Sequence, residues 1–457
     1  MLQLALLATP ASAATTITVT PSGGDDTAAI QAAFDAAVQA GPGSTVRLTA
    51  GHFYTNNILV TDFRGYFKGA GECVTVIDTL RGKYPNGPGV TLTPDPGDPT
   101  TYLEPFAFLI GFCGGNVSVS AMSFDITAPD PAAPYFDSPD LPGRTSLGEV
   151  IVVTGNASSA FDRISFTAGE GDVGGLGGYD GLDGLNVGGN IGIMGKGLKG
   201  WDAAGENWVW LSLEPTGGVH RVTRCSFAGL AGVEVLGLTA GRLVIGGCAA
   251  KQNVFDQYWE ACVLIDVSSS YVEISHNRMT AKGGSSSGVF ALQGFATLPP
   301  LPAPRYVITD NDVRAAGGAS GVWLGDFSYD YGAAGRLKAV IADNTIKLGD
   351  GCLGVGEYCT KNIKVRHNCL SSCPETVAFA GIYVGDDFGG PDGTTLWPVR
   401  GWKIIGNDLR NLTASEAPIV LGEGTTRCVV VCPWRTDVLD KGVHNILVNA
   451  NRLPWSP

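Results

Sequence analysis

Short runs in which apolar and polar residues alternate recur along most of the chain, as in VEIS (272–275). Successive side chains of a strand point to opposite faces, so each run predicts a strand with one face toward a core. Turn-forming residues separate the runs, and long helical periodicities are few. The pattern predicts a protein of many short strands.

Seven of the predicted strands share a core phrase, and a second phrase containing an asparagine follows each of them. The core phrases are GVEVLG (232–237), CVLIDV (262–267), GVFALQ (288–293), GVWLGD (321–326), CLGVGE (352–357), GIYVGD (381–386) and PIVLGE (418–423). The asparagines are Asn253, Asn277, Asn311, Asn344, Asn368, Asn407 and Asn451. Their spacing predicts a solenoid unit of about two dozen residues with insertions of varying length.

A parallel β-helix accounts for this repeat, because short strands of successive units can stack around a core of like side chains. The asparagines would form a column at one turn, where their amides bond along the axis. A WD40-type propeller has a comparable period, but its GH and WD signatures are missing.

The stretch DDTAAIQAAFDAAVQAGPGSTVRLTAGHFYTNN (25–57) resembles the N-terminal end of the right-handed parallel β-helix proteins of the pectin-lyase-like superfamily. The resemblance implies an all-β, single right-handed parallel β-helix with an N-terminal capping helix. Ile30, Phe34, Ala37 and Val38 would share one helical face and cover the open end of the core.

The chain is therefore expected to form one solenoid domain. Residues 15–60 would provide the cap and first strands, and 61–457 the β-helix, with a glycine-rich loop insertion at about 169–215. Residues 1–14 have the apolar stretch and small-residue cleavage pattern of a signal peptide, which predicts a secreted protein. Eleven cysteines fit an oxidising compartment, and Cys352/Cys359, Cys369/Cys373 and Cys428/Cys432 are candidate disulfide pairs.

The formal net charge of −13 disfavours nucleic acid and anionic membranes as partners. The superfamily resemblance instead implies a polysaccharide partner, since most members cleave or modify polysaccharides. Of the polygalacturonase-like motifs only an Asp-Asp pair, Asp386-Asp387, is present, and the pectate-lyase motifs are missing. Pectin is therefore poorly supported as the substrate, and the oligomeric state stays open.

The second position of each core strand should point outward, because the first and third, such as Val322 and Leu324, point into the core. The outward column is Glu234, Leu264, Phe290, Trp323, Gly354, Tyr383 and Val420. Phe290, Trp323 and Tyr383 are candidate substrate-binding residues, since a sugar ring stacks on an aromatic face. The alternative is that long loops bury them.

A ladder of carboxylates is predicted at the ends of four core strands. Its members are Asp326, Glu357, Asp386 and Glu423. On coils about 4.8 Å apart, such a ladder predicts a raised pKa, a bound cation or a neighbouring base. Alternatively, the acids begin turns and project into water.

A glycoside hydrolase is the main functional prediction. Carboxylates on adjacent coils would be about as far apart as those of a retaining glycosidase, and carboxylates two coils apart would approach the separation in an inverting one. Glu357 or Asp386 would be the general acid, with Asp326 or Asp387 as base or nucleophile. Trp323, Tyr383 and Glu423 would bind the sugar.

Two other functions remain open. A polysaccharide lyase would bind Ca²⁺ through the ladder, with Lys338, Arg336 or Arg400 as candidate base, whereas the hydrolase needs no cofactor. A non-catalytic binding or adhesion solenoid would use the aromatic residues alone. Metal ligands are unknown, because the polar column His276, Asp310, Asp343 and His367 is more typical of a solvated edge than of a metal site.

Overall fold

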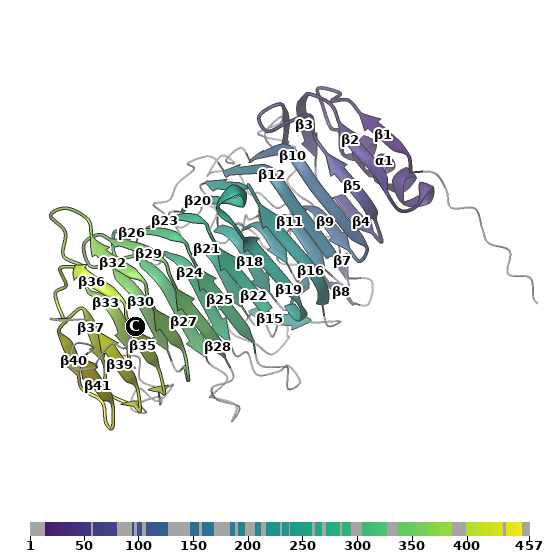
Figure 1. The fold of residues 1–457 in the computed structure, drawn as a ribbon. Helices are drawn as coiled ribbons and strands as arrows, with labels where there is room; N and C mark the ends of the chain where they lie inside the picture. Colours follow the sequence, from purple (N-terminus) through teal and green to yellow (C-terminus); the bar gives the residue numbers. More distant parts are fainter. Residues whose placement is uncertain are drawn as a thin grey trace, which may run out of the picture.

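The protein is a parallel β-helix, seen in a computed structural model as stacked coils that lead from the N-terminal helix to the C-terminal strands (Figure 1). The structure describes residues 14–449 except 56–57, 80–93, 96–97, 103–106, 127–146, 155–157, 169–182, 188–190, 197–205, 212–215, 229–230, 237, 258–260, 267–270, 284–285, 294–303, 327–336, 359, 386–398 and 433–435. Residues 1–13 of the predicted signal peptide lie outside this range. The prediction of an all-β solenoid is confirmed.

Three walls of parallel strands enclose the core. The first wall comprises β1 (Thr16–Val19), β2 (Ser44–Leu48), β5 (Arg64–Lys68), β10 (Asn116–Ile126), β12 (Ser158–Ala168), β16 (Thr216–Thr223), β19 (Leu238–Gly246), β22 (Tyr271–Ser275), β25 (Arg305–Thr309), β28 (Lys338–Ala342), β31 (Lys364–Arg366), β35 (Lys403–Ile405), β39 (Val429–Cys432) and β41 (Ile446–Asn449).

The second wall shares β10 and β12 with the first, so the two walls form one 23-stranded sheet. Its other strands are β3 (Gly51–Thr55), β6 (Thr75–Thr79), β17 (Ser226–Ala228), β20 (Val254–Gln257), β23 (Arg278–Lys282), β26 (Asp312–Ala316), β29 (Thr345–Leu348), β32 (Cys369–Ser372) and β36 (Asp408–Asn411).

The third wall is a separate 12-stranded sheet. It comprises β4 (Ile58–Thr61), β9 (Ala107–Cys113), β11 (Leu147–Thr154), β13 (Asp183–Val187), β18 (Ala231–Leu236), β21 (Ala261–Asp266), β24 (Ser287–Gln293), β27 (Ser320–Asp326), β30 (Leu353–Tyr358), β33 (Ala380–Val384), β37 (Ile419–Leu421) and β40 (Val438–Asp440). Outside the walls, β34 (Val399–Arg400) pairs with β38 (Thr425–Thr426), and η1 (Ala249–Lys251) is a short 3₁₀ helix.

The segment predicted as a loop insertion at 169–215 contains strands. Its β13 pairs in parallel with β11 and β18 and is thus a rung of the third wall. Beyond it, β14 (Ile191–Lys196) and β15 (Glu206–Leu211) form an antiparallel hairpin that joins β8 (Asp98–Tyr102) and β7 (Pro94–Asp95). The glycine-rich composition concealed these strands, because glycine weakens the hydrophobic alternation that marks a strand.

The helix α1 (Thr27–Ala40) confirms the predicted cap. Ile30, Phe34 and Ala37 are fully buried, and the Phe34 ring lies 5.0 Å from the Phe67 ring between centroids. Val38 does not belong to the buried face, because 39% of its surface is exposed. Among the described residues no helix is long and apolar enough to span a membrane.

The core beneath the second wall is a stack of aromatic rings. Phe124, Phe166, Phe227 and Phe255 occupy the same inward position of successive coils, with centroids 4.8–5.2 Å apart and nearly parallel planes. This separation matches the distance between paired strands. Like side chains therefore fix the register of the coils.

The predicted asparagine column is present and buried from Asn253 to Asn407, whereas Asn451 lies outside the described residues. From Asn253 to Asn368, each amide donates to the side-chain oxygen of the next asparagine, for example from Asn311 Nδ2 to Asn344 Oδ1 at 2.9 Å. The same Asn344 oxygen accepts the Asn311 backbone N–H at 3.0 Å. The column therefore satisfies backbone groups at the turn between the first two walls.

The polar column before these asparagines has a conformational cause. His276, Asp310, Asp343 and His367 have positive φ angles of 53–58°. Asn, Asp and His are the non-glycine residues that enter this left-handed region most readily. Backbone geometry thus accounts for the column, and the exposed His367 Nδ1 and Asp343 Oδ1 lie 3.8 Å apart.

The described cysteines form no disulfides, contrary to the prediction. Cys369 and Cys373 are four residues apart across the extended β32, as are Cys428 and Cys432 across β39. Four extended residues span about 13 Å, well beyond the Cα separation of up to about 7 Å that a disulfide allows. Cys359, the predicted partner of Cys352, lies outside the described residues.

Candidate functional site

The outer face of the third wall carries the predicted aromatic column. Phe290 on β24 lies opposite Trp323 on β27, and Leu264 on β21 lies opposite Phe290. All three side chains are half-buried. The next coil presents Gly356, not Gly354, opposite Trp323, so the expected register is wrong on β30 by two residues.

Two glycines in CLGVGE caused this error. The leading small residue of each phrase points into the core, where Gly321 approaches Ile346 and the carbonyl oxygen of Gly354 so closely that a Cβ would lie 2.5–2.9 Å from them. Gly354, rather than Cys352, is therefore the counterpart of Gly321 on β30. A shift of two residues preserves the alternation, so the sequence pattern alone did not reveal it.

The shift removes Glu357 from the predicted carboxylate ladder. Glu357 lies opposite Leu324, which points into the core, and only 1% of its surface is exposed. Its Oε2 accepts hydrogen bonds from the Thr360 hydroxyl and from the Thr360 backbone N–H at 3.1 Å. Trp402 Nε1 in turn donates to Thr360 Oγ1 at 3.0 Å. Glu357 therefore holds the turn after β30 from inside and does not line an outer surface.

The position of the Trp323 ring depends on the absence of a side chain at Gly356. A Cβ on Gly356 would lie 2.6 Å from Trp323 Cε3, so the indole lies over this glycine. The ring also packs at the edge of an apolar cluster on the outside of the wall. This cluster, called the outer cluster below, consists of Leu353, Ala380, Tyr383, Ala417 and Val420.

Tyr383 was predicted to be exposed, but it is buried. It does share the outward column, because it lies opposite Val420, but only 7% of its surface and 1% of that of Val420 are accessible. The outer cluster thus covers the C-terminal part of the column. Among the described side chains of the outward column, the half-buried ones are Leu264, Phe290 and Trp323.

Of the other predicted acids, the structure describes only the backbone of Asp326 and the whole of Glu423. The backbone of Asp326 ends β27 opposite Gln293, and its side chain lies outside what the structure describes, as do Asp386 and Asp387. Glu423 follows β37 and is exposed. Within the described part of the chain, no group of three or more His, Cys, Asp or Glu side chains is arranged to hold a metal ion.

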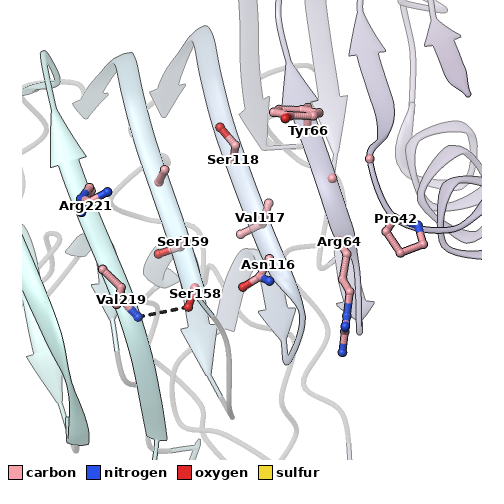
Figure 2. Close-up of a pocket in the computed structure, with 13 residues that line it drawn as sticks. Pro42, Arg64, Tyr66, Asn116, Val117, Ser118, Ser158, Ser159, Val219 and Arg221 are labelled. Atoms are coloured by element: carbon pink, nitrogen blue, oxygen red, sulfur yellow. Dashed lines mark hydrogen bonds between the residues drawn. The ribbon is translucent and has the colours of Figure 1, made fainter. Parts of the chain in front are cut away.

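A concave surface, the groove, crosses β5, β10, β12 and β16 on the outside of the first wall (Figure 2). Its volume is about 600 Å³. Arg64 and Tyr66 border it on β5, and Val219 and Arg221 border it on β16. The floor between them consists of the small residues Asn116, Ser118, Ser158 and Ala160. The hollow exists because the two middle coils present short side chains where the flanking coils present long ones.

The outward positions of the first wall are strongly basic, a property that the acidic net charge concealed. The exposed cations are Arg47, Arg64, Lys68, Arg221, Arg242, Arg305, Lys338, Lys364, Arg366 and Lys403. The acids at described outward positions of this wall, Asp162 and Glu273, are both paired with arginines. Recurrence of Arg or Lys near the start of the second phrases was the signal that sequence reasoning overlooked.

Asp162 and Glu273 are held by contacts with neighbouring side chains. Partial burial alone would raise the pKa of Asp162, but hydrogen bonds from Arg224 and Thr223 hold this pKa below its usual value. Arg242 Nη2 lies 2.9 Å from Glu273 Oε2. The guanidinium carbons of Arg242 and Arg305 lie 5.1 and 5.6 Å from the Tyr271 ring centroid, so this ring contacts two cations.

The candidate bases of a lyase do not gather on the third wall. Lys338 begins β28 on the first wall and is exposed there, rather than lying in a loop. Arg400 belongs to β34, which pairs with β38 outside the three walls. Arg336 lies outside the described residues.

No protein-family model matches the chain, and no curated protein sequence matches it significantly. Similar solved structures include the mannuronan C-5 epimerase AlgE6 A-module of Azotobacter vinelandii, with 16% identity, a TM-score of 0.40 and coverage of 93% of this chain and 95% of that one. A periplasmic alginate epimerase has 11% identity, a TM-score of 0.48 and coverage of 89% and 83%. A GH87 α-1,3-glucanase of Streptomyces thermodiastaticus has 13% identity, a TM-score of 0.45 and coverage of 92% and 66%. These similarities concern the fold alone, which is that of a parallel β-helix.

Proposed function

We propose that the protein is a secreted carbohydrate-active enzyme that binds a polysaccharide on the outer face of the third wall, at β24 and β27. The observation that supports this most is the register of Phe290 opposite Trp323, with both rings half-buried on neighbouring coils. A pyranose ring has an apolar face that stacks on such rings, while its hydroxyls take hydrogen bonds. The binding face is therefore shorter than the full predicted column.

The proposed reaction is hydrolysis by carboxyl groups at the ends of the third-wall strands. Asp326 ends β27, and Asp386 comes two residues after the end of β33 in the sequence; β27 and β33 are two strand spacings, or about 10 Å, apart in the third wall. This spacing is close to the range of about 6.5–9.5 Å for inverting glycosidases. One acid would protonate the leaving oxygen and the other would activate water. Glu357 takes no part, because it lies inside the coil.

The test is to incubate the protein with neutral and uronic polysaccharides while measuring new reducing ends and ultraviolet absorbance together. Hydrolysis predicts reducing ends without absorbance at roughly 235 nm, where unsaturated uronates absorb. Trp323→Ala should lower the rate, and Asp326→Asn should abolish it. If the products absorb at roughly 235 nm and EDTA eliminates this absorbance, the enzyme is a Ca²⁺-dependent lyase and not a hydrolase. Binding without product would contradict catalysis and leave an adhesion protein.

A further inference from the structure

We propose that the first wall carries a second binding site, for a carboxylated polysaccharide, that is separate from the third-wall site. It consists of the groove and of the basic stripe that continues from it along the axis: Arg242, Tyr271, Arg305, Lys338, Lys364 and Lys403. The two sites lie on different sheets of the β-helix.

Register determines the shape of the groove. One outward row runs from Arg64 through Asn116 and Ser158 to Val219, and a parallel row runs from Tyr66 to Arg221. The borders on β5 and β16 are three coil steps apart, or about 14 Å. The groove can therefore hold a few sugar units along the axis of the solenoid.

The lining supplies three kinds of contact. Arg64 and Arg221 are exposed and have no ion-pair partner among the described residues, so both can bind carboxylates. Tyr66, with 53% of its surface exposed, offers a ring face for a pyranose. Asn116 and Ser118 can bond to hydroxyls. Figure 2 shows Tyr66 and Arg221 on opposite sides of the small floor residues.

The stripe continues the exposed cations and an aromatic ring along the first wall beyond the groove. Arg242, Tyr271, Arg305 and Lys338 occupy one outward row of successive coils, and Lys364 and Lys403 continue in the neighbouring row. Arg242 is paired with Glu273, so the stripe cations without an ion-pair partner among the described residues are Arg305, Lys338, Lys364 and Lys403. Cations on successive coils are about 4.8 Å apart. A linear polymer with one carboxylate per sugar can therefore follow the axis and meet a cation at most steps.

Charge density distinguishes this ligand from duplex nucleic acid. Duplex DNA carries a charge every 1.7 Å or so, which is far denser than cations at the coil spacing. A polyuronate, whose charges are sparse and whose rings can stack, fits the first wall better.

The experiment is a titration of the full-length protein with polygalacturonate oligomers, their carboxyl-reduced counterparts and a single-stranded oligonucleotide. The variant R64Q/R221Q should weaken polygalacturonate binding roughly tenfold and reduce its salt dependence. The matched control R314Q/K347Q removes two exposed cations from the second wall and should change affinity less than about twofold. Ser118→Trp, which fills the groove without changing charge, should also weaken binding.

Equal losses in R64Q/R221Q and R314Q/K347Q would overturn the site, because they would show attraction by charge alone. Binding of the carboxyl-reduced oligomer as tight as that of the acidic one would overturn the role of the arginines. Tighter binding of the oligonucleotide would overturn the carbohydrate assignment. The titration measures binding and not turnover, so an absence of hydrolysis at the third wall would not be mistaken for failure of this site.

Discussion

The first and third walls are built from the same coils, yet their outer faces differ. The first wall presents cations and small polar residues, and short turns connect it to the second wall, as from β22 to β23 through residues 276–277. The third wall presents aromatic and apolar residues, and longer segments leave it, as from β27 to β28 through residues 327–337. Inward residues and tight turns thus define the coil, whereas outward residues and long connections are free to create binding surfaces.

The largest effect should come from an inward glycine of the third wall. Gly321→Val would place a Cβ 2.5 Å from the Gly354 carbonyl oxygen and should lower the free energy of unfolding by about 3 kcal/mol or more. Urea denaturation measures this change. The matched change at an exposed outward position, Thr345→Val, should stay within about 0.5 kcal/mol. Similar losses in both would contradict the distinction between inward and outward positions.

Asp326, the proposed catalytic carboxylate, and Glu357, which is buried inside the coil, should differ in their effects on the rate. Asp326→Asn should lower turnover at least about 100-fold, because a general acid or base is lost. Glu357→Gln should keep turnover within about threefold while reducing stability, because it weakens the bond with Thr360 inside the coil. Initial rates and thermal melting together measure both. The reverse pattern would place Glu357 in the active site.

The asparagine column should contribute somewhat less than the glycine. Asn311→Ala removes bonds to Asn277 and Asn344 and leaves buried backbone groups without partners, which should cost about 2 kcal/mol. Asp310→Asn, at the exposed left-handed position before it, should change stability by less than about 0.5 kcal/mol. Chemical denaturation of both variants tests the prediction. Equal losses would mean that the turn conformation, rather than the column, carries the stability.

The smallest effect under ordinary conditions concerns the buried thiols. Burial raises the pKa of Cys225 to about 12 and that of Cys428 to about 11. Each thiol has a lower pKa when unfolded, so its stabilising contribution is complete below about pH 8.5 and is lost as the pH rises through the folded pKa. Melting temperature measured across this range should fall less in Cys225→Ala than in wild type. The exposed Cys369→Ala should follow the wild-type curve.

The sequence predicted the interior of the coil best. Repeated inward residues and the asparagine column leave a periodic signal, because every coil must satisfy the same packing and hydrogen bonds. The helix cap was predicted from the resemblance of residues 25–57 and from one apolar helical face, on which Val38 alone proved exposed. The register of β30 was predicted wrongly, because the phrase CLGVGE contains two glycines. Only contacts between coils distinguish Gly354 from Gly356.

The outer surfaces were harder to predict. Burial of Tyr383 arises from the outer cluster, which joins residues that are separated in sequence. The basic first wall was missed because a net charge averages over all faces, whereas Arg305 and Lys338 gather on one face only after the coils are stacked. The groove likewise requires knowing that Ser118 and Ala160 lie side by side between longer residues.

The most direct test of the proposed function is the initial rate of product release by wild type, Trp323→Ala and R64Q/R221Q on a polysaccharide that the wild type cleaves. The third-wall site predicts that Trp323→Ala lowers the rate at subsaturating substrate by at least about tenfold, because substrate binding is weakened. R64Q/R221Q should retain the wild-type rate at saturation. An unchanged rate in Trp323→Ala, or no product from any polysaccharide with the wild type, would contradict it.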